Sequence, residues 1–523
     1  LLERGLGGEV RHMNNTYATD YAASLHDPES FWAEQSRQLH WFHRPPRPVL
    51  GPADPVSGAA RWFEGGQLNT SWLCLDYHVE NGRAEQVALV YDSPVTRTVR
   101  SYTYQELLDL TSRFAGGLRD LGVEPGDRVI IYMPNLPEAV VAMLACARLG
   151  AVHSVVFGGF APHELAVRID DARPRVIVCA SAGLEFDKVV PYKPLVDAAI
   201  RQARHQPNSV VVLQRDFCLA ELTPAGVTAQ PRAIDYRELL RAAPVAAVPL
   251  DATDPLYILY TSGTTGKPKG VVRDNGGHAV VLRYSLPAIY DVQPGDTFWA
   301  ASDIGWAVGH SYIVYGPLLL GCTTVLFEGK PVRTPDAGTF WRVIEDHRVK
   351  VLFTAPTAIR AIKKEDPEGR LARRYDLSSL RALFVATPPP TSGPGRCWAC
   401  RWSTTGGRPN RAGPCWPRLP ATPMRPRPAP ARPATPCRAT PCRCSTRPGS
   451  PCPPAPPGWW PYSCPCRPAA CPRSGRTRPA SGRPTSAPSL ATTSPATGAT
   501  RTRTATSTSW AGWMTSSTWP ATA

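Results

Sequence analysis

The last 137 residues of this 523-residue chain contain no Asp, Glu, Lys, His, Val, Ile or Phe. The same stretch holds 18 arginines, 30 of the chain's 58 prolines and 10 of its 15 cysteines. A segment of this composition does not bury enough apolar surface to offset the entropy of ordering its chain. We therefore expect residues 387–523 to form a disordered, Arg/Pro-rich tail.

Outside that tail the chain lacks an excess of positive charge. The formal net charge is +16, but without the 18 tail arginines 40 basic residues face 42 acidic ones, which leaves −2 for the first 386 residues. A basic protein often binds nucleic acid or anionic membrane, but here this inference applies to the tail alone. We predict no specific nucleic-acid partner, and keep as an alternative a non-enzymatic product whose basic arm binds nucleic acid.

Long apolar runs and paired cysteines are also missing. The longest apolar stretch, 139–160, is interrupted by Arg148 and His153, whereas a membrane span needs ~18 uninterrupted apolar residues. We predict no membrane span. Five cysteines are scattered singly before position 387, as is typical of a reducing compartment. The tail cysteines lack histidine partners and ligand spacing, so no metal site is predicted. The chain starts at Leu1 rather than Met, and we expect the true N-terminus to precede it.

From Tyr102 onward, helical and strand patterns alternate. Apolar spacing predicts helices over Tyr104–Leu121, Pro137–Leu149, Pro162–Asp171 and Thr339–His347. Strands are predicted at Arg128–Tyr132, Val152–Phe157, Arg175–Ala180, Leu256–Tyr260, Thr323–Phe327, Val351–Phe353 and Ala382–Val385. This alternation indicates an α/β fold in which largely parallel, buried sheets are flanked by helices.

A string of ten residues, 261–270, reads T-S-G-T-T-G-K-P-K-G and follows the predicted strand Leu256–Tyr260. Glycines let a backbone turn tightly and point its N–H groups at an anion, while hydroxyls and lysines bind phosphate oxygens. The string is not a Walker A loop, because Gly263 and Gly266 enclose two residues instead of four. The predicted phosphate-binding residues are Thr261, Ser262, Gly263, Thr264, Thr265, Gly266, Lys267 and Lys269.

This string resembles the ATP-phosphate loop of the acyl-adenylate-forming enzymes. Further segments narrow the resemblance to short-chain acyl-CoA synthetases, most like their mitochondrial, propionate-preferring group, over about 12–386. These segments are 91–94 (Y-D-S-P), 132–134 (Y-M-P), 143–148 (M-L-A-C-A-R), 156–160 (V-F-G-G-F), 301–306 (A-S-D-I-G-W), 309–312 (G-H-S-Y) and 327–331 (F-E-G-K-P). The resemblance implies an N-terminal cap segment over 1–100 and an incomplete AMP-binding domain over 101–386.

The resemblance also implies an acid–thiol ligase that uses ATP, Mg²⁺ and coenzyme A. A short-chain carboxylate, propionate or acetate, attacks the α-phosphorus of ATP to give an acyl-adenylate, and coenzyme A then displaces AMP. Lys269 and Thr264 are the implied catalytic residues. The acyl pocket falls on Trp306, Ala307 and Val308, and the coenzyme A contact on Glu185, Phe186, Asp187 and Lys188. A medium-chain or aromatic acid remains an alternative substrate, and the implied location is the mitochondrial matrix, or else the cytoplasm.

His310 could serve as a ligand or base, or it could be a structural histidine. We favour the structural role. The oligomeric state is left open by the sequence.

After Ala386 the family's later motifs are not printed, but they return in a shifted reading frame. Codons built from the last base of one triplet and the first two of the next let Trp510–Thr522 encode M-G-R-M-D-D-V-I-N-V-A-G-H. The same frame lets Trp402–Asn410 encode V-V-D-H-W-W-Q-T-E, a second family motif in the expected order. We infer that 387–523 is an out-of-frame translation, and expect the printed chain to be inactive or nearly so.

Overall fold

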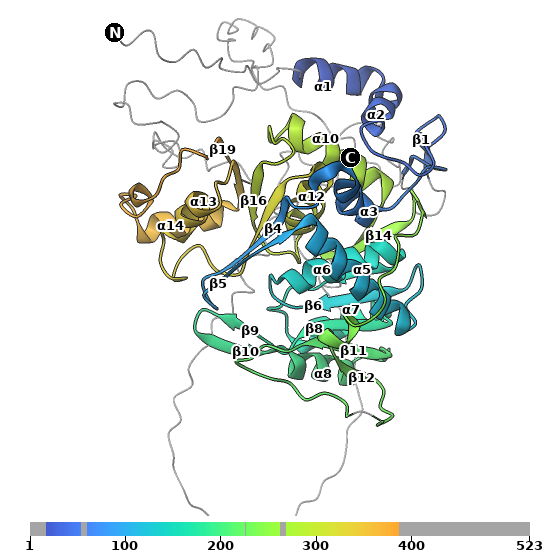
Figure 1. Cartoon of the computed structure of the whole chain (residues 1–523), viewed down its shortest axis with the longest axis vertical. Helices are drawn as coiled ribbons and strands as arrows, with labels where there is room; N and C mark the ends of the chain where they lie inside the picture. The colour runs from blue at the N-terminus through green and yellow to red at the C-terminus, as the bar shows by residue number, and fades with distance from the viewer. Residues whose placement is uncertain (1–16, 54–59, 225, 262–267, 386–523) are drawn as a thin grey trace, which may run out of the picture. The chain divides into compact units, whose positions relative to one another are not determined.

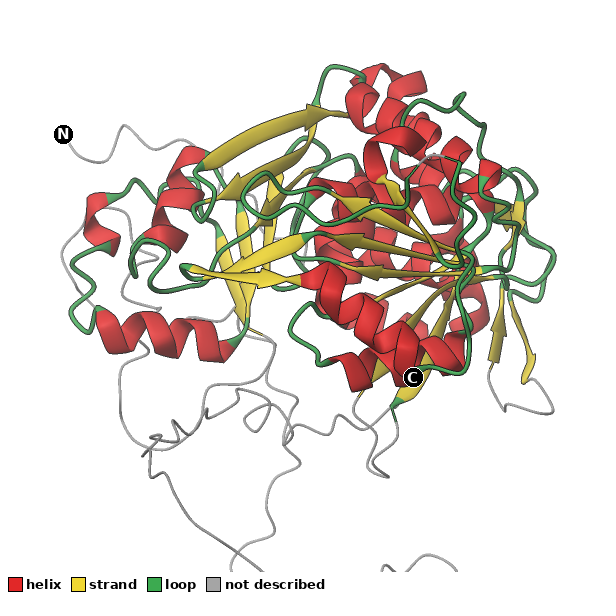
Figure 2. Cartoon of the chain, turned by 90° about the horizontal axis from the view of Figure 1, so that it is seen from below, coloured by secondary structure: helices red, strands yellow, loops and turns green. Residues whose placement is uncertain are grey.

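Two mostly parallel β-sheets form the centre of the protein (Figures 1 and 2). The computed structural model describes residues 17–53, 60–224, 226–261 and 268–385. The larger sheet has the order β12 (Arg232–Asp235), β11 (Ser209–Leu213), β8 (Val176–Ala180), β6 (Arg128–Tyr132), β7 (Val152–Val155), β14 (Pro255–Thr261), β15 (Lys269–Asp274). Its strands are parallel except for the hairpin β14–β15.

The second sheet has six strands. Their order is β19 (Ala382–Val385), β18 (Val351–Thr354), β16 (Thr297–Ala301), β17 (Thr323–Phe327), β4 (Val87–Ser93), β5 (Thr98–Thr103). Only β4 and β5 pair antiparallel. Since β4 pairs with β17, residues 87–103 belong to this sheet.

Helices fill the space between the sheets and cover their outer faces (Figure 1). Between the sheets, α6 (Pro137–Leu149) packs on β6 and β7, and α5 (Tyr104–Asp120) packs on α6, β4 and β5. Nearly every side chain of α6 is buried, which explains why its sequence is apolar on all faces. On the outer faces, α8 (Tyr192–Gln202) packs on β8 and α7 (Pro162–Ala172). Residues of α13 (Thr339–Asp346) and α14 (Pro356–Glu365) share a second core with the six-stranded sheet.

Local sequence signals set the ends of the central helices. Thr103 and Glu106 form a reciprocal capping box at the start of α5. Pro137 occupies the first turn of α6, and Gly150 ends it in the left-handed conformation at φ 75°. These signals explain why the sequence predicts both bounds of α6 correctly.

The remaining elements connect these layers or precede them. In the N-terminal part they are α1 (Tyr17–His26), α2 (Pro28–Ser36), β1 (Leu50–Ala53), β2 (Ala60–Trp62), β3 (Gln67–Leu68), α3 (Thr70–Cys74), α4 (Asp76–His78) and the turn η1 (Val79–Arg83). Later come β9 (Ala182–Glu185), β10 (Lys188–Pro191), α9 (Tyr236–Leu239), β13 (Leu250–Asp251), α10 (Gly276–Ala288), α11 (Ala307–Gly309), η2 (His310–Tyr315), α12 (Gly316–Leu320) and η3 (Ala372–Arg374).

The predicted α/β class is confirmed, and the predicted elements are all present with small changes at their ends. The largest change is in β7, which ends at Val155, two residues before the predicted end. The predicted disordered tail lies outside the described residues. In the part of the chain that is described, no helix combines the length and apolar character that a membrane span requires. The five cysteines before 387 are free thiols, four of them buried.

Candidate active site

The carboxyl ends of the parallel strands in the two sheets meet, and one asparagine ties them together. Asn135 follows β6 in the larger sheet. Its Nδ2 donates to the carbonyl oxygens of Ser302 (3.0 Å) and Phe327 (3.1 Å), at the ends of β16 and β17. Its Oδ1 accepts from the N–H of Ile304 at 3.1 Å. Ligands of parallel α/β sheets bind outside the carboxyl ends of the strands, so the candidate site lies here.

A buried ion pair makes a second link between these ends. Arg215 follows β11 in the larger sheet, Glu328 follows β17 in the smaller one, and their nearest nitrogen and oxygen are 3.1 Å apart. The same carboxylate accepts from the hydroxyls of Tyr91 and, at 2.8 Å, Ser93. Burial raises the pKa of Tyr91, and the Glu328 charge raises it further. The Tyr91 hydroxyl therefore stays protonated and donates to Glu328.

The predicted phosphate loop connects β14 to β15. Because β14 runs parallel to β7, its last residue, Thr261, lies at the carboxyl edge of the sheet. Thr261 pairs in register with Lys269, and its Oγ1 is 3.5 Å from the carbonyl oxygen of Lys269. Both residues are exposed, and Lys269 has no ion-pair partner among the described residues. The Lys269 ammonium thus remains available for an anion. The predicted ligands Ser262, Gly263, Thr264, Thr265, Gly266 and Lys267 lie outside the described residues.

The predicted acyl-pocket residues follow β16 in a tight turn. Asp303 accepts a hydrogen bond from the N–H of Gly305 at 2.7 Å, and Gly309 packs so closely that a Cβ there would lie 2.0 Å from the Asp303 carbonyl oxygen. The turn leaves Trp306 half-buried, with its ring centroid 5.7 Å from that of Phe157 in the loop after β7. Burial raises the pKa of Asp303, although the Gly305 N–H and the Lys330 charge oppose the rise.

Of the other two pocket residues, Ala307 is exposed and Val308 is half-buried against the main core. Trp306, Ala307 and Val308 therefore lie together, at the carboxyl end of β16.

Three histidines are buried behind this turn, in a cluster with two tyrosines. His310 is fully buried, and its Nδ1 donates to the Trp306 carbonyl oxygen at 3.1 Å. Its ring stacks on His153 at 5.5 Å, and His153 shares a 2.5 Å hydrogen bond with the Tyr315 hydroxyl. Burial lowers the pKa of His310 to about 4 and that of His278 to about 3, and it lowers the pKa of His153 strongly. These rings are neutral at pH 7.

The predicted coenzyme A residues form the turn of the hairpin β9–β10. Glu185 and Lys188 are register partners, and Phe186 between them has a positive φ of 58°. The guanidinium of Arg333, in the loop after β17, lies 4.6 Å from the Phe186 ring centroid. This contact brings the hairpin beside the loop that follows Glu328. Asp187 and Lys188 complete the turn.

In the described ranges no three His, Cys, Asp or Glu side chains lie close enough together to hold a metal ion.

Sequence comparison identifies the family. The family model described as "AMP-binding enzyme" matches residues 76–403, more than half of the chain. A second family model, described as "Acetyl-coenzyme A synthetase N-terminus", matches residues 17–74. This chain belongs to the AMP-binding enzymes.

Individual proteins are similar to this chain over about 70% of its length. The mitochondrial acyl-CoA synthetase short-chain family member 3 of Homo sapiens is 48% identical over 388 residues, 73% of this chain and 55% of that protein. The propionate–CoA ligase of Escherichia coli is 45% identical over 377 residues, 72% of this chain and 58% of that protein. The solved acetoacetyl-CoA synthetase from Streptomyces lividans matches with a TM-score of 0.62 and 28% identity, over 70% of this chain and 54% of that chain. The chain spans little more than half the length of these relatives.

Sequence reasoning assigned no role to Asn135, Arg215 or Glu328. Each follows a parallel strand within three residues, which is the position where this fold class places ligand-site residues. That positional signal was present in the sequence. Their mutual contacts were not, because they join residues 113 to 192 positions apart.

Proposed function

We propose that residues 17–385 form the ATP- and carboxylate-binding part of a short-chain acyl-CoA synthetase whose preferred acid is propionate. The observation that carries the proposal is the meeting of the carboxyl ends of the two sheets, which Asn135 joins through the carbonyl oxygens of Ser302 and Phe327. Thr261 lies at the carboxyl edge of the larger sheet, and the T-S-G-T-T-G-K-P-K-G segment begins at this residue. The printed names of the human and Escherichia coli relatives agree with this substrate class.

In the proposed first step, a carboxylate oxygen attacks the α-phosphorus of ATP, and the bond from that phosphorus to the bridging oxygen breaks. Pyrophosphate leaves and the acyl-adenylate forms. In the second step, the sulfur of coenzyme A attacks the acyl carbon, the thiol loses its proton, and AMP departs. ATP already carries the leaving group, so the protein contributes positioning and charge neutralisation.

The proposed residue roles follow from placement. Thr261 and Lys269 lie at the loop end of the β14–β15 hairpin, where a hydroxyl and an ammonium would contact the β- and γ-phosphates. Lys269 and Thr264 are the proposed catalytic residues, with Ser262, Gly263, Thr265, Gly266 and Lys267 completing the loop. Mg²⁺ would neutralise phosphate charge and be held through ATP.

Trp306, Ala307 and Val308 are the proposed wall of the acyl pocket. An apolar wall separates acids that differ by one methylene by only ~1–3 kcal/mol, so acetate and butyrate are expected as slower substrates. For coenzyme A we propose the hairpin turn Glu185–Lys188, in which Lys188 supplies the positive charge that pairs with a phosphate.

Two further proposals concern the printed chain. The residues after 386 carry none of the family's later motifs as printed, so we propose that this polypeptide is inactive until the reading frame is restored. By analogy with the human relative, we propose the mitochondrial matrix as its location, with the cytoplasm as the alternative suggested by the bacterial relative.

The deciding experiment measures acid-dependent pyrophosphate release from ATP by two proteins. One is the printed chain, and the other carries the shifted-frame translation after residue 386. We expect release with propionate from the second protein only. Equal rates with hexanoate or benzoate would favour the medium-chain or aromatic alternative, and no release from either protein would overturn the proposal.

A matched pair of lysine variants assigns the activity to the loop. Lys269→Gln is expected to lower the rate by about 100-fold, the typical loss when one charge-stabilising donor is removed. Lys363→Gln, an exposed lysine on α14, serves as the control and should leave the rate unchanged.

A further inference from the structure

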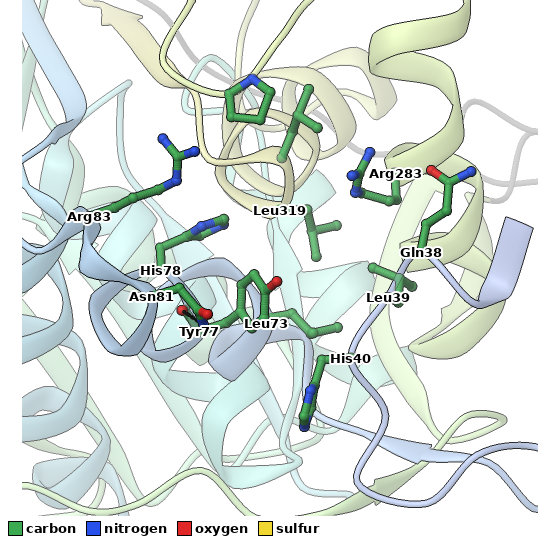
Figure 3. A pocket seen from close by; sticks show the side chains of 12 residues that line it. Gln38, Leu39, His40, Leu73, Tyr77, His78, Asn81, Arg83, Arg283 and Leu319 are labelled. Carbon is green, nitrogen blue, oxygen red and sulfur yellow. Dashed lines mark hydrogen bonds between the residues drawn. The ribbon is translucent and has the colours of Figure 1, made fainter.

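A small cavity lies at the edge of the six-stranded sheet opposite to the candidate active site (Figure 3). Its volume is about 220 Å³. Leu319 and Leu320 in its wall precede the start of β17, and Arg83 precedes β4. The cavity therefore opens near the amino ends of these strands, whereas the candidate active site uses their carboxyl ends.

Among the described residues, the wall of this cavity is rich in nitrogen donors and contains no acid. Twelve residues line it: Gln38, Leu39, His40, Leu73, Tyr77, His78, Asn81, Arg83, Arg283, Pro294, Leu319 and Leu320. Figure 3 shows Arg83 on one side of the cavity and Arg283 on the other, with His78 beside Arg83. Two positive charges thus face one enclosed space without a carboxylate in its lining.

Arg283, on α10, has no hydrogen bond or ion pair with any residue that the structure describes. Burial lowers the pKa of its guanidinium, and the groups that oppose this shift are Tyr77 and Cys322, not a carboxylate. Removing a cation from water without a partner is costly. An anion in the cavity would offset this cost.

The neighbouring groups also have unused capacity. His78 is 3% exposed, and its Nε2 has no hydrogen-bond partner among the described residues. Burial, with the added charges of Arg83 and Arg283, lowers the pKa of His78 to about 4, although hydrogen bonds to the backbone of Leu318 and Leu319 oppose the shift. Arg83 donates one hydrogen bond, from Nη1 to Gln86 Oε1 at 2.7 Å, and its other guanidinium nitrogens remain available as donors. Two guanidinium groups from two segments, those of Arg83 and Arg283, are therefore unpaired or partly paired around the same space.

We propose that this cavity is a binding site for a small phosphate-type oxyanion, held between the guanidinium groups of Arg83 and Arg283. The planar guanidinium fork matches the geometry of phosphate oxygens. The cavity is smaller than the ~300 Å³ at the low end for drug-sized ligands, which favours inorganic phosphate or pyrophosphate over a nucleotide.

The test is isothermal titration calorimetry of the full chain with inorganic phosphate and, separately, pyrophosphate, at constant ionic strength. The variant Arg283→Met is compared with Arg201→Met, which removes an exposed arginine of α8 outside the cavity. The tail arginines are the same in both proteins, so the difference reports on the cavity. We expect Arg283→Met to weaken binding by about tenfold or more, the loss typical of one hydrogen bond to a charged group. Equal affinity in the two variants would overturn the proposal.

A measurement on the unmodified chain covers the case in which Arg283→Met does not fold. Phenylglyoxal modifies arginine side chains, and mass spectrometry of the digested protein reports the modified positions. Phosphate is expected to protect Arg83 and Arg283 but not Arg201. Unchanged labelling of Arg83 and Arg283 at saturating concentrations of both anions would overturn the site, whereas protection by pyrophosphate alone would identify the larger anion as its ligand.

Discussion

At the residue scale, Glu328 carries a negative charge that is 6% exposed and faces Arg215, which is 9% exposed. We expect Glu328→Gln to lower the free energy of unfolding by about 3–5 kcal/mol, because one partner of a buried ion pair is then left without its counter-charge. Urea denaturation measures the change.

The control for that variant is an exposed ion pair in the same protein. Arg348 and Asp376 are 61% and 52% exposed, so Asp376→Asn should lower the free energy of unfolding much less than Glu328→Gln does. Similar losses for Glu328→Gln and Asp376→Asn would contradict the view that the Arg215–Glu328 pair holds the two sheets together.

Trp306 offers a second test at the same scale. Trp306→Gly removes the ring that packs against Phe157 and enlarges the proposed acyl pocket. In the frame-restored enzyme we expect kcat/KM to shift from propionate toward pentanoate and hexanoate, by ~1–3 kcal/mol for each methylene accommodated. Rates with the acid series measure the shift, and Phe42→Ala, at an exposed aromatic residue of the N-terminal part, is the control. An unchanged preference would remove Trp306 from the pocket.

At the element scale, the turn between β16 and η2 depends on a close backbone approach. A Cβ at Gly309 would lie 2.0 Å from the Asp303 carbonyl oxygen, and backbone atoms of this turn lack room to move aside. We expect Gly309→Ala to cost about 1–3 kcal/mol, as for other overpacked sites. Thermal unfolding of Gly309→Ala is compared with that of Gly277→Ala, whose Cβ would meet only the movable Asp274 carboxylate.

The buried histidines on the neighbouring elements predict how stability depends on pH. Burial lowers the folded-state pKa of His310 to about 4 and of His278 to about 3, whereas an unfolded histidine titrates near ~6.5. Below that pH the histidines bind protons in the unfolded state but not in the folded state. The free energy of unfolding is therefore retained above about pH 6.5 and falls as the solution is acidified toward pH 4.

Each such histidine contributes a slope of about 1.4 kcal/mol per pH unit within that window. Urea unfolding at pH 7, 6 and 5 should show a shallower slope for His278→Asn than for the unmodified protein. His163→Asn, at an exposed position, is the matched control. The histidine explanation fails if His278→Asn and His163→Asn have the same slope.

The elements also show how far sequence reasoning reaches. Strong local signals such as Pro137 and Gly150 placed both ends of α6 correctly. The end of β7 was predicted two residues late, because Val156 and Phe157 remain apolar after leaving the sheet. Apolar character alone does not distinguish a strand from a buried turn. The convergence of Asn135, Arg215 and Glu328 depends on tertiary contacts, which no periodic pattern records.

At the scale of the whole molecule, the tail and the described part predict opposite behaviour toward polyanions. Residues 387–523 contribute 18 arginines and no acid, while the first 386 residues carry −2. We expect the printed chain to be retained on single-stranded RNA, with a log-affinity that falls against log salt by ~0.7 per phosphate neutralised.

The comparison protein carries the shifted-frame translation after residue 386, and we expect it to lose this retention. Equal retention of both proteins would place the RNA-binding charge outside the tail. Retention of the printed chain without any acid-dependent pyrophosphate release from the comparison protein would support the non-enzymatic alternative.

The side chain of Asn135 uses both of its N–H donors and its carbonyl oxygen to join strand ends from the two sheets. An isosteric aspartate would turn a negative oxygen toward two carbonyl oxygens, and a glutamine would carry its amide one methylene too far. This position therefore tolerates a single residue type. Among proteins that share this topology, we expect an asparagine at this position even where the surrounding loops differ in length and composition.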